Sequence, residues 1–270
     1  MKLVAIGGGE IGRPGTKIET KKIDQEIIKL TGKKHPRVLF IPTASSDSES
    51  YYDVVKKYYG EKLGCKTDAL YLLKENYTKK EIENKILNSD IIYVGGGNTL
   101  RMLKTWRKLG VDKILEKAAK KDIVLSGISA GAICWMKYGN SDSMRFGPSK
   151  NKKLIKLKGL DFVDLMVCPH YNAEKSRQSS LKRMIKKYGG SAIALENRTA
   201  IEIIDDKYRI ITSSKKAKAY KLYKSNGKVI TVETKAIITV TIIVIRLTNL
   251  SDLISLKFPG IHQYRFFTYS

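Results

Sequence analysis

The segment Asp122-Ile-Val-Leu-Ser-Gly-Ile-Ser-Ala-Gly-Ala132 places Ser129 between a short apolar run and a stretch that can begin a helix. Residues 123–126 are typical of a buried strand, and no helix breaker follows Gly131 before residue 136. A serine on a sharp strand-to-helix turn presents its Oγ above the sheet, and flanking glycines tolerate the strained backbone. The first N–H groups of the helix can also hold an oxyanion. The segment therefore predicts a nucleophile elbow, although a plain strand–helix turn that contains serine has the same pattern.

Short β-branched runs alternate with amphipathic stretches on both sides of this segment, which is typical of parallel βαβ units. We expect strands at residues 3–6, 37–41, 67–72, 91–94, 123–126 and 165–168, and helices near 21–30, 50–63, 79–87, 99–108, 112–120 and 174–187. After residue 192, short strands at 193–195, 200–204, 208–212 and 219–223 are joined by tight turns. The pattern predicts one three-layer α/β domain, with a mostly parallel sheet, helices on both faces and a small antiparallel edge.

The composition is that of an ordinary globular protein, but the charge is strongly positive. Of the 270 residues, 42% are hydrophobic and 29% are charged, and the formal net charge is +25. Such a charge favours nucleic-acid binding, because neutralising phosphates drives non-specific association. The lysines are nevertheless spread over every predicted helix, and no nucleic-acid-binding motif accompanies them. Solvated helix faces explain the charge more simply, so no nucleic-acid partner is expected.

Signals for membranes, export and metal binding are weak in this sequence. The apolar run at residues 236–245 is shorter than the roughly 20 residues that span a bilayer. Residues 1–6 run straight into glycines and are too short for a signal peptide. Cys65, Cys134 and Cys168 lie far apart, without metal-ligand spacing. We therefore expect a cytoplasmic protein with no membrane partner, no metal and no disulfide framework.

Three loops follow predicted strands, at the edge where parallel sheets form their sites. Residues 7–12 match the dinucleotide-binding pattern G-x-G-x-x-G, but Arg13-Pro14-Gly15 stands where a helix must begin, so no nucleotide cofactor is expected. Residues 95–99, Gly-Gly-Gly-Asn-Thr, let backbone N–H groups approach a substrate, as an oxyanion hole or as a carboxylate site. They can equally form a glycine turn with a helix cap. The third loop, residues 168–174, carries a histidine.

His170 is the best candidate for a general base to Ser129. It follows a predicted core strand, whereas His35 lies in a turn and His262 in the C-terminal segment. Such a base needs a group that orients its imidazole, most often a carboxylate. The candidates for this carboxylate are Glu196, at the end of the next strand, and then Asp164 and Asp142.

At these residues the chain resembles the aspartyl dipeptidase (peptidase E) and cyanophycinase group of serine peptidases. The resemblance covers residues 1–232 and rests on Gly-Gly-Gly-Asn-Thr-Leu at 95–100, Gly-Ile-Ser-Ala-Gly-Ala at 127–132 and Cys-Pro-His-Tyr at 168–171, in this order. It implies a flavodoxin-like fold similar to the class I glutamine amidotransferase domain, with serine in place of the nucleophilic cysteine. The site that it implies has Ser129 as nucleophile, His170 as base, Glu196 as third member, and an oxyanion hole at Gly96, Gly97 and Ala130.

The sequence thus predicts a hydrolase of short peptides or isopeptides that needs no cofactor. Its partner is a small peptide substrate, and a homodimer stays open. The candidate substrate contacts are Asn98, Tyr171, Asn172 and Arg177. Arg177 is the nearest counterpart of the basic residue that reads an acidic N-terminal residue in the aspartyl dipeptidases, although an ion pair with Glu174 on the helix surface is equally compatible with its spacing.

Two further readings remain open from the sequence. The chain is also compatible with a catalytically silent binding protein that keeps an amidotransferase-like pocket, and with a basic nucleic-acid-associated protein. Residues 233–270 do not resemble the family's ending. We expect them to form a divergent C-terminal tail, so that residues 1–232 make up the catalytic domain.

Overall fold

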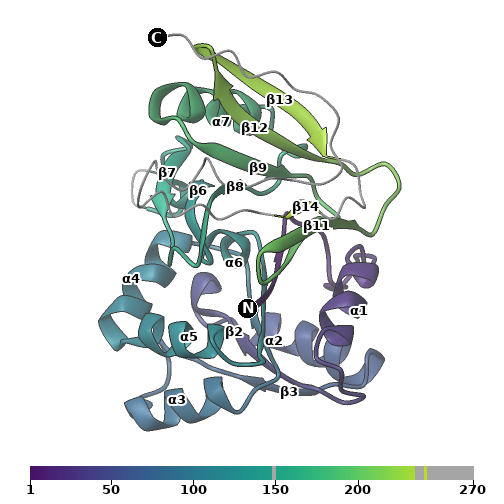
Figure 1. The fold of residues 1–270 in the computed structure, drawn as a ribbon. Helices are drawn as coiled ribbons and strands as arrows, with labels where there is room; N and C mark the ends of the chain where they lie inside the picture. Colours follow the sequence, from purple (N-terminus) through teal and green to yellow (C-terminus); the bar gives the residue numbers. More distant parts are fainter. Residues whose placement is uncertain (148–149, 235–239, 242–270) are drawn as a thin grey trace, which may run out of the picture.

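The computed structural model describes residues 1–147, 150–234 and 240–241. Within these residues the strands form two sheets, one of eight strands and one of six. Figure 1 shows the six-stranded sheet above the eight-stranded one, with helix α7 (Lys175–Tyr188) beside the upper sheet and the remaining helices around the lower one. The chain is therefore a mixed α/β structure, which confirms the predicted fold class.

The eight-stranded sheet holds the predicted parallel core. Its strands lie in the order β14 (Val240–Thr241), β11 (Lys207–Thr212), β10 (Thr199–Ile204), β1 (Lys2–Ile6), β5 (Val124–Ile128), β4 (Ile91–Val94), β2 (Arg37–Ile41) and β3 (Lys66–Ala69). The strands β1, β5, β4, β2 and β3 pair in parallel with one another, whereas β10 is antiparallel to β1 and β11, and β14 is antiparallel to β11. The predicted antiparallel edge is therefore present next to β1, but only two of its four predicted strands, 200–204 and 208–212, belong to it; the strands predicted at 193–195 and 219–223 lie in the other sheet.

Helices cover both faces of this sheet because its strands are apolar on both sides. In β1, for example, Leu3 and Ala5 pack into one core, and Val4 and Ile6 pack into the other. The first core lies against α3 (Lys79–Leu87), α4 (Thr99–Leu109), α5 (Val111–Ala119) and the short α6 (Ala130–Ile133). The second lies against α1 (Lys21–Lys29) and α2 (Glu49–Val55), which continues as π-helical turns over Lys56–Lys62.

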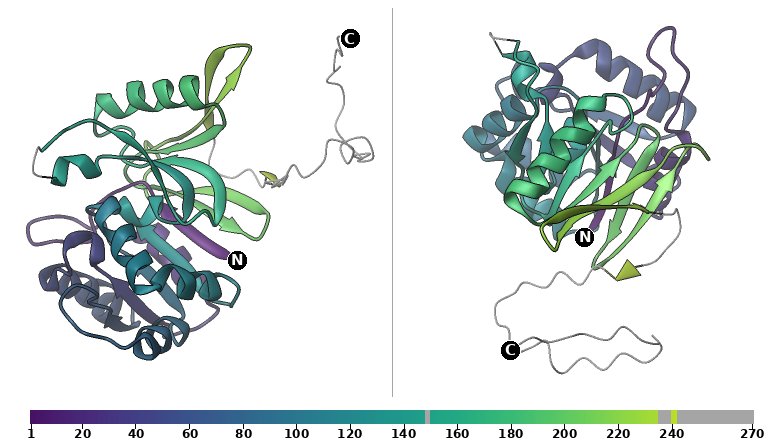
Figure 2. Two further views of the ribbon diagram at one scale, coloured as in Figure 1. Left: turned by 90° about the vertical axis from the view of Figure 1, so that its left-hand side faces the viewer. Right: turned by 90° about the horizontal axis from the view of Figure 1, so that it is seen from above.

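The six-stranded sheet was not predicted as a separate element. Its order is β13 (Lys228–Thr234), β12 (Ala219–Ser225), β9 (Ser191–Leu195), β8 (Val163–Cys168), β6 (Met136–Ser141) and β7 (Ile155–Lys158). Helix α7 packs on it through Leu181, Met184 and Ile185, which share a core with Ala192 and Ala194 of β9. In the turned views of Figure 2 the two sheets are seen as distinct layers of one molecule.

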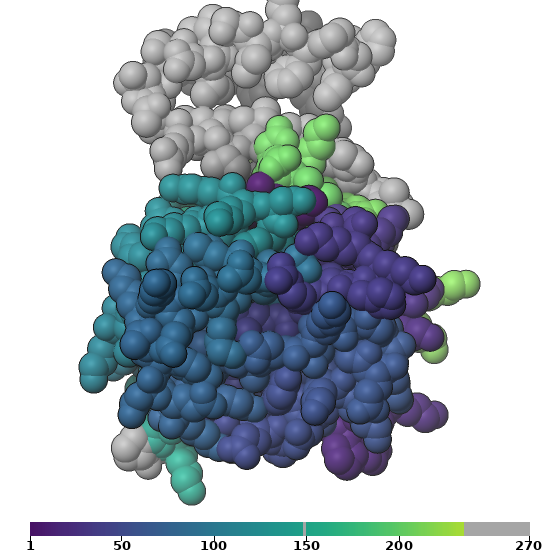
Figure 3. All heavy atoms as spheres, turned by 90° about the horizontal axis from the view of Figure 1, so that it is seen from below, coloured from purple at the N-terminus to yellow at the C-terminus, as the bar shows by residue number. Residues whose placement is uncertain are grey.

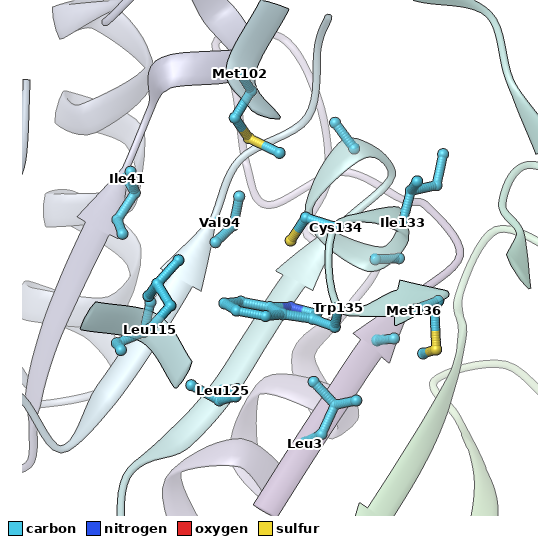
Figure 4. Packing of buried hydrophobic residues seen from close by; sticks show 14 of the residues in the cluster. Leu3, Ile41, Val94, Met102, Leu115, Leu125, Ile133, Cys134, Trp135 and Met136 are labelled. Atoms are coloured by element: carbon cyan, nitrogen blue, oxygen red, sulfur yellow. The ribbon is translucent and has the colours of Figure 1, made fainter. Parts of the chain in front are cut away.

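The chain first passes between the sheets directly after Ser129, through the short helix α6. As expected, a helix begins at Ala130, but α6 is short: it ends at Ile133, and Met136 already begins β6. The helix stops early because Trp135 is fully buried among β1, β4, β5 and α5, as Figure 4 shows. Gly139 then lets β6 lie against α6, since an added Cβ would be 2.4 Å from Cγ2 of Ile133.

The face seen in Figure 3 is formed mostly by the first half of the chain, purple to blue, which supplies the parallel strands and their helices. No helix in the described part of the chain is long and apolar enough to cross a membrane.

The predicted tail, residues 233–270, lies outside the described residues apart from positions 233–234, at the end of β13, and 240–241, which form β14.

Candidate active site

Ser129 occupies a sharp turn between the end of β5 and the start of α6. Its backbone has φ 57° and ψ −104°, a conformation that residues other than glycine rarely adopt. The flanking glycines are required for steric reasons. At position 127, an added Cβ would lie 2.6 Å from the carbonyl oxygen of Gly131. At position 131, it would lie 2.1 Å from the carbonyl oxygen of Val94. This is the backbone geometry of a nucleophile elbow.

The glycine loop after β4 lies directly beside this turn. An added Cβ on Gly96 would be 3.5 Å from Cβ of Ser129, so the loop backbone borders the serine side chain. Gly97 has φ 136°, and its Cβ would be 2.3 Å from the carbonyl oxygen of Ala44, so only glycine fits there. Ala130 is the first residue of α6, where a backbone N–H has no partner within the helix. Of the three predicted oxyanion-hole residues, Gly96 therefore borders the side chain of Ser129, Ala130 follows Ser129 in the chain, and Gly97 lines the same cavity.

His170 lies just beyond the end of β8, in the other sheet. Its backbone is also left-handed, at φ 53°, and its N–H donates to the carbonyl oxygen of Gly7 over 2.9 Å. Burial lowers the pKa of its imidazole below the usual value, against the opposing effect of the hydrogen bond between the imidazole and the amide oxygen of Asn197, which raises it. The imidazole is therefore mostly neutral near pH 7, as a general base must be.

Ser129 and His170 line one cavity of about 1060 Å³, together with Gly96, Gly97 and Asn197. Within the described residues, no hydrogen bond yet joins Oγ of Ser129 to the imidazole. Such catalytic hydrogen bonds often tighten only when substrate is bound. The topology thus brings the carboxyl ends of β5 and β8, from different sheets, to one cavity.

The imidazole of His170 contacts a different residue from the predicted carboxylate. Its Nδ1 lies 2.7 Å from Oδ1 of Asn197. The carboxylate of Glu196 instead accepts hydrogen bonds from the backbone N–H of Lys218, over 2.9 Å, and from the hydroxyl of Tyr220, over 3.4 Å. The two alternative carboxylates are paired elsewhere: Asp142 with Arg177 and Asp164 with Lys137.

Sequence reasoning reached the correct turn for the partner of His170 and missed Asn197. The only signal was its position beside Glu196 in the segment Ala194-Leu-Glu-Asn197. Successive residues of a strand point to opposite sides, but the strand β9 ends at Leu195 and a turn follows. The alternation therefore gave no basis for choosing between the two neighbours.

Comparison with known proteins decides the family. Residues 3–211 match peptidase family S51. The chain belongs to this family. Uncharacterized peptidase YgaJ of Bacillus subtilis is 34% identical over 232 residues, which are 84% of this chain and 94% of that protein. The protein named probable alpha-aspartyl dipeptidase of Drosophila melanogaster is 24% identical over 202 residues, 70% of this chain and 77% of its own. The predicted family is therefore confirmed.

Solved structures of peptidases share the fold of this S51 peptidase. A peptidase from an acI-B1 actinobacterium superposes with a TM-score of 0.67 at 18% identity, covering 89% of this chain and 96% of that one. A putative peptidase E protein from Listeria monocytogenes EGD-e gives 0.58 at 24% identity, covering 79% and 98%. These two likenesses show the shared fold, whereas the match to family S51 and the peptidase-named relatives show that the chain is a peptidase, and S51 membership makes it one of the serine type.

The predicted substrate contacts of this S51 peptidase do not lie among the described residues that line the cavity. Asn98 caps α4 by accepting from the N–H of Arg101. Tyr171 is buried beside Tyr220, with ring centroids 5.3 Å apart. Arg177 is 2% exposed, and it pairs with Asp142 over 3.1 Å and donates to the backbone of β6.

The loops that form the cavity walls were predicted only in part: the glycine motif at residues 7–12 was expected to border the site at this edge of the sheet, and the other wall residues were not predicted. These loops are residues 9–14, with Glu19, and residues 45–57 around α2. The loop 7–12 is not followed by a helix, because Ile11 forms an isolated bridge with Ile18 and α1 begins only at Lys21. This agrees with the expectation that the glycine motif borders the site. In the described part of the chain, no group of three or more His, Cys, Asp or Glu residues is placed to hold a metal ion.

Proposed function

We propose that this peptidase hydrolyses short peptides or isopeptides with Ser129 as its nucleophile and His170 as its general base. The observation that carries the proposal is the strained elbow of Ser129 in the same cavity as the half-buried, mostly neutral imidazole of His170. The resemblance of the elbow and histidine segments to serine peptidases supports the same roles.

The reaction follows the general scheme of serine hydrolases. Oγ of Ser129 attacks the carbonyl carbon while the imidazole of His170 accepts its proton. Backbone N–H groups of Gly96, Gly97 and Ala130 then stabilise the oxyanion of the tetrahedral intermediate. The imidazolium returns the proton to the leaving amine, and an acyl ester on Ser129 remains. Water activated by His170 hydrolyses this ester and frees the serine.

The walls of the cavity bear on the kind of peptide. Glu10, Glu19 and Asp53 contribute carboxylates, and Arg13 and Lys57 contribute cations, so the lining carries both signs. Arg177, which was predicted to read an acidic first residue, is buried in an ion pair. We therefore propose a peptidase for short peptides. Any preference of this enzyme for an acidic first residue comes from the cavity walls rather than from Arg177.

The test compares wild type with Ser129→Ala on a mixture of short peptides, with cleavage followed by mass spectrometry. The mixture includes dipeptides with N-terminal aspartate and β-aspartyl-arginine isopeptides. Wild type is expected to cleave part of the mixture and Ser129→Ala to lose at least about 10³-fold in rate, since removing a triad member has effects of this order.

The matched control is Ser126→Ala, three residues earlier in the chain. It removes a buried hydroxyl that has no hydrogen-bond partner among the described residues. This variant is expected to react with a fluorophosphonate as wild type does, whereas Ser129→Ala is not. A folded wild type that neither cleaves nor reacts with the fluorophosphonate would refute the proposal and favour a catalytically silent binding protein.

A further inference from the structure

The group that faces Nδ1 of His170 is a neutral amide. Oδ1 of Asn197 lies 2.7 Å from this nitrogen, and an amide oxygen can only accept a hydrogen bond. The contact therefore requires the proton of the neutral imidazole to be on Nδ1. The other nitrogen, Nε2, is then unprotonated and carries the lone pair that a general base needs.

The turn that carries Asn197 is fixed on all sides. Thr199 closes the turn, because its N–H and its hydroxyl both donate to the carbonyl oxygen of Glu196, over 3.2 and 2.7 Å. Arg198 has φ 70° and donates its N–H to the carbonyl oxygen of Gly8. The N–H of Asn197 itself donates to Oδ1 of Asn172 over 3.0 Å. Asn172, predicted to contact substrate, thus supports this turn instead.

The backbone of Gly8 covers the amide–imidazole contact directly. An added Cβ on Gly8 would lie 2.2 Å from Oδ1 of Asn197 and 2.4 Å from Nδ1 of His170. Any side chain at position 8 would therefore displace one of the two groups. Gly8 has φ 156°, which favours glycine as well. The chain is thus built to hold these two side chains against each other.

We propose that Asn197 is the positioning residue of His170: it holds the imidazole with Nδ1 protonated, so that Nε2 can accept the proton of Ser129. This inference rests on the proposed function, and it assigns to an amide the role that was predicted for the carboxylate of Glu196. An amide orients the ring as a carboxylate does, but it supplies no negative charge to the imidazolium that forms during the reaction.

Charged groups near His170 take part in its titration. Besides burial and Asn197, Arg177 lowers the pKa of the imidazole, while Asp142 and Glu174 raise it. These charges come from the segment after β6 and from the start of α7. Substituting a carboxylate for Asn197 adds a negative charge in direct contact, so the pKa of His170 is expected to rise.

The experiment records the imidazole signals of the full chain by NMR across pH. The chain has three histidines, so His170 is assigned by the signal that His170→Gln removes. In wild type we expect the tautomer with Nδ1 protonated and a titration midpoint below 6.5. Asn197→Asp is expected to raise the midpoint by about one unit, the size of shift that a contacting opposite charge produces. Asn197→Leu is expected to abolish the preference for that tautomer.

The competing arm is Glu196→Gln, one residue earlier in the same turn. Its carboxylate contacts Lys218 and Tyr220, so we expect neither the tautomer nor the midpoint of His170 to change. A lower midpoint in Glu196→Gln together with an unchanged one in Asn197→Asp would overturn the inference. So would a wild-type imidazole protonated on Nε2.

Kinetics give a second readout. The acid limb of kcat/KM in Asn197→Asp is expected to move upward with the NMR midpoint, and Asn197→Leu is expected to lose about 10²-fold in kcat, within the range that general-base catalysis contributes. An unchanged pH profile in both variants would contradict the assignment. Cleavage that persists in Ser129→Ala would instead refute the proposed function, and the NMR result would still decide the role of Asn197.

Discussion

At the residue scale, the candidate site depends on backbone conformations that most side chains avoid. Ser129, His170 and Arg198 have φ of 57°, 53° and 70°. Each such conformation costs on the order of 1–3 kcal/mol and persists only where surrounding contacts fix it. Two of the three residues line the cavity, and the third lies in the turn that carries Asn197. Three of the nine non-glycine residues with positive φ in the described part of the chain therefore belong to the candidate site.

A buried carboxyl group lies in α1, which packs on the eight-stranded sheet. Asp24 of α1 is fully buried and accepts hydrogen bonds from Thr20, Tyr58 and Tyr59 over 2.7 to 2.9 Å. Burial raises its pKa to about 6, even though these three donors favour the charged form. The carboxyl therefore carries its proton in the folded chain at a pH where the unfolded chain has already lost it.

The stability contributed by protonated Asp24 is full below its unfolded pKa of 3.8 and is lost as pH rises through about 6. The loss amounts to about 3 kcal/mol. Asp24→Asn removes this titration and keeps the shape, because the tyrosine and threonine hydroxyls can accept as well as donate. Urea unfolding of the variant, compared with wild type, is expected to show a gain in stability that grows from pH 4 to pH 7.

Asp206→Asn, which changes an exposed turn carboxylate, serves as the control for this comparison. Its difference in unfolding free energy from wild type is expected to stay nearly constant over the same range. If Asp24→Asn behaved in the same way, Asp24 would not be the source of the predicted pH dependence.

At the element scale, the sequence predicts strands and helices well where their patterns are regular. The strands at residues 37–41 and 91–94 and the helix at 79–87 have the predicted bounds. β6 and β7 were missed, because β6 contains Gly139 and Asn140 and β7 is a four-residue strand with two lysines. Both are stabilised by pairing with distant strands, and a local pattern does not report that pairing.

The close packing of β6 on α6 gives a prediction. Gly139→Ala is expected to lower the free energy of unfolding by about 1–3 kcal/mol, because its Cβ would overlap Ile133 in a fully packed core. The matched control is Gly147→Ala, whose Cβ would come no closer than 3.5 Å to Met144 and whose φ is −83°. Urea denaturation measures both, and equal midpoints for the two variants would contradict this account of the packing.

At the scale of the whole molecule, the number of sheets is what the sequence did not reveal. The chain passes from β5 to β6 just after Ser129, and from β9 to β10 through the turn that carries Asn197. A strand has the same apolar pattern whether it joins the sheet of the preceding strand or the other sheet. The positions of the strands were therefore predictable, but the sheet to which each belongs was not. Ser129 and His170 were nonetheless placed correctly at strand ends, because those ends carry their own motifs.

The net charge of +25 is a property of the whole molecule, and it predicts a salt effect. Lysines repel one another in the folded state, and the ion pairs that offset them are largely exposed, as in Lys74–Glu49, and so contribute little. Raising the ionic strength from about 10 mM to about 150 mM shortens the Debye length from about 30 to about 8 Å. The Tm is therefore expected to rise by a few degrees in calorimetry. A lower Tm in salt would mean that attractive pairs outweigh the repulsion.

The hairpin-like loop at the cavity mouth has a consequence for how this protein could diversify. Residues 10–19 are closed on themselves, by the bridge between Ile11 and Ile18, the ion pair of Glu10 with Arg13, and the bond from the N–H of Glu10 to Glu19. The loop supplies wall residues and none of the groups proposed for bond cleavage. Substitutions within residues 11–18 are therefore expected to change which peptides enter the cavity, whereas Glu19 also pairs with Arg198 over 3.8 Å and so links the loop to the turn that carries Asn197.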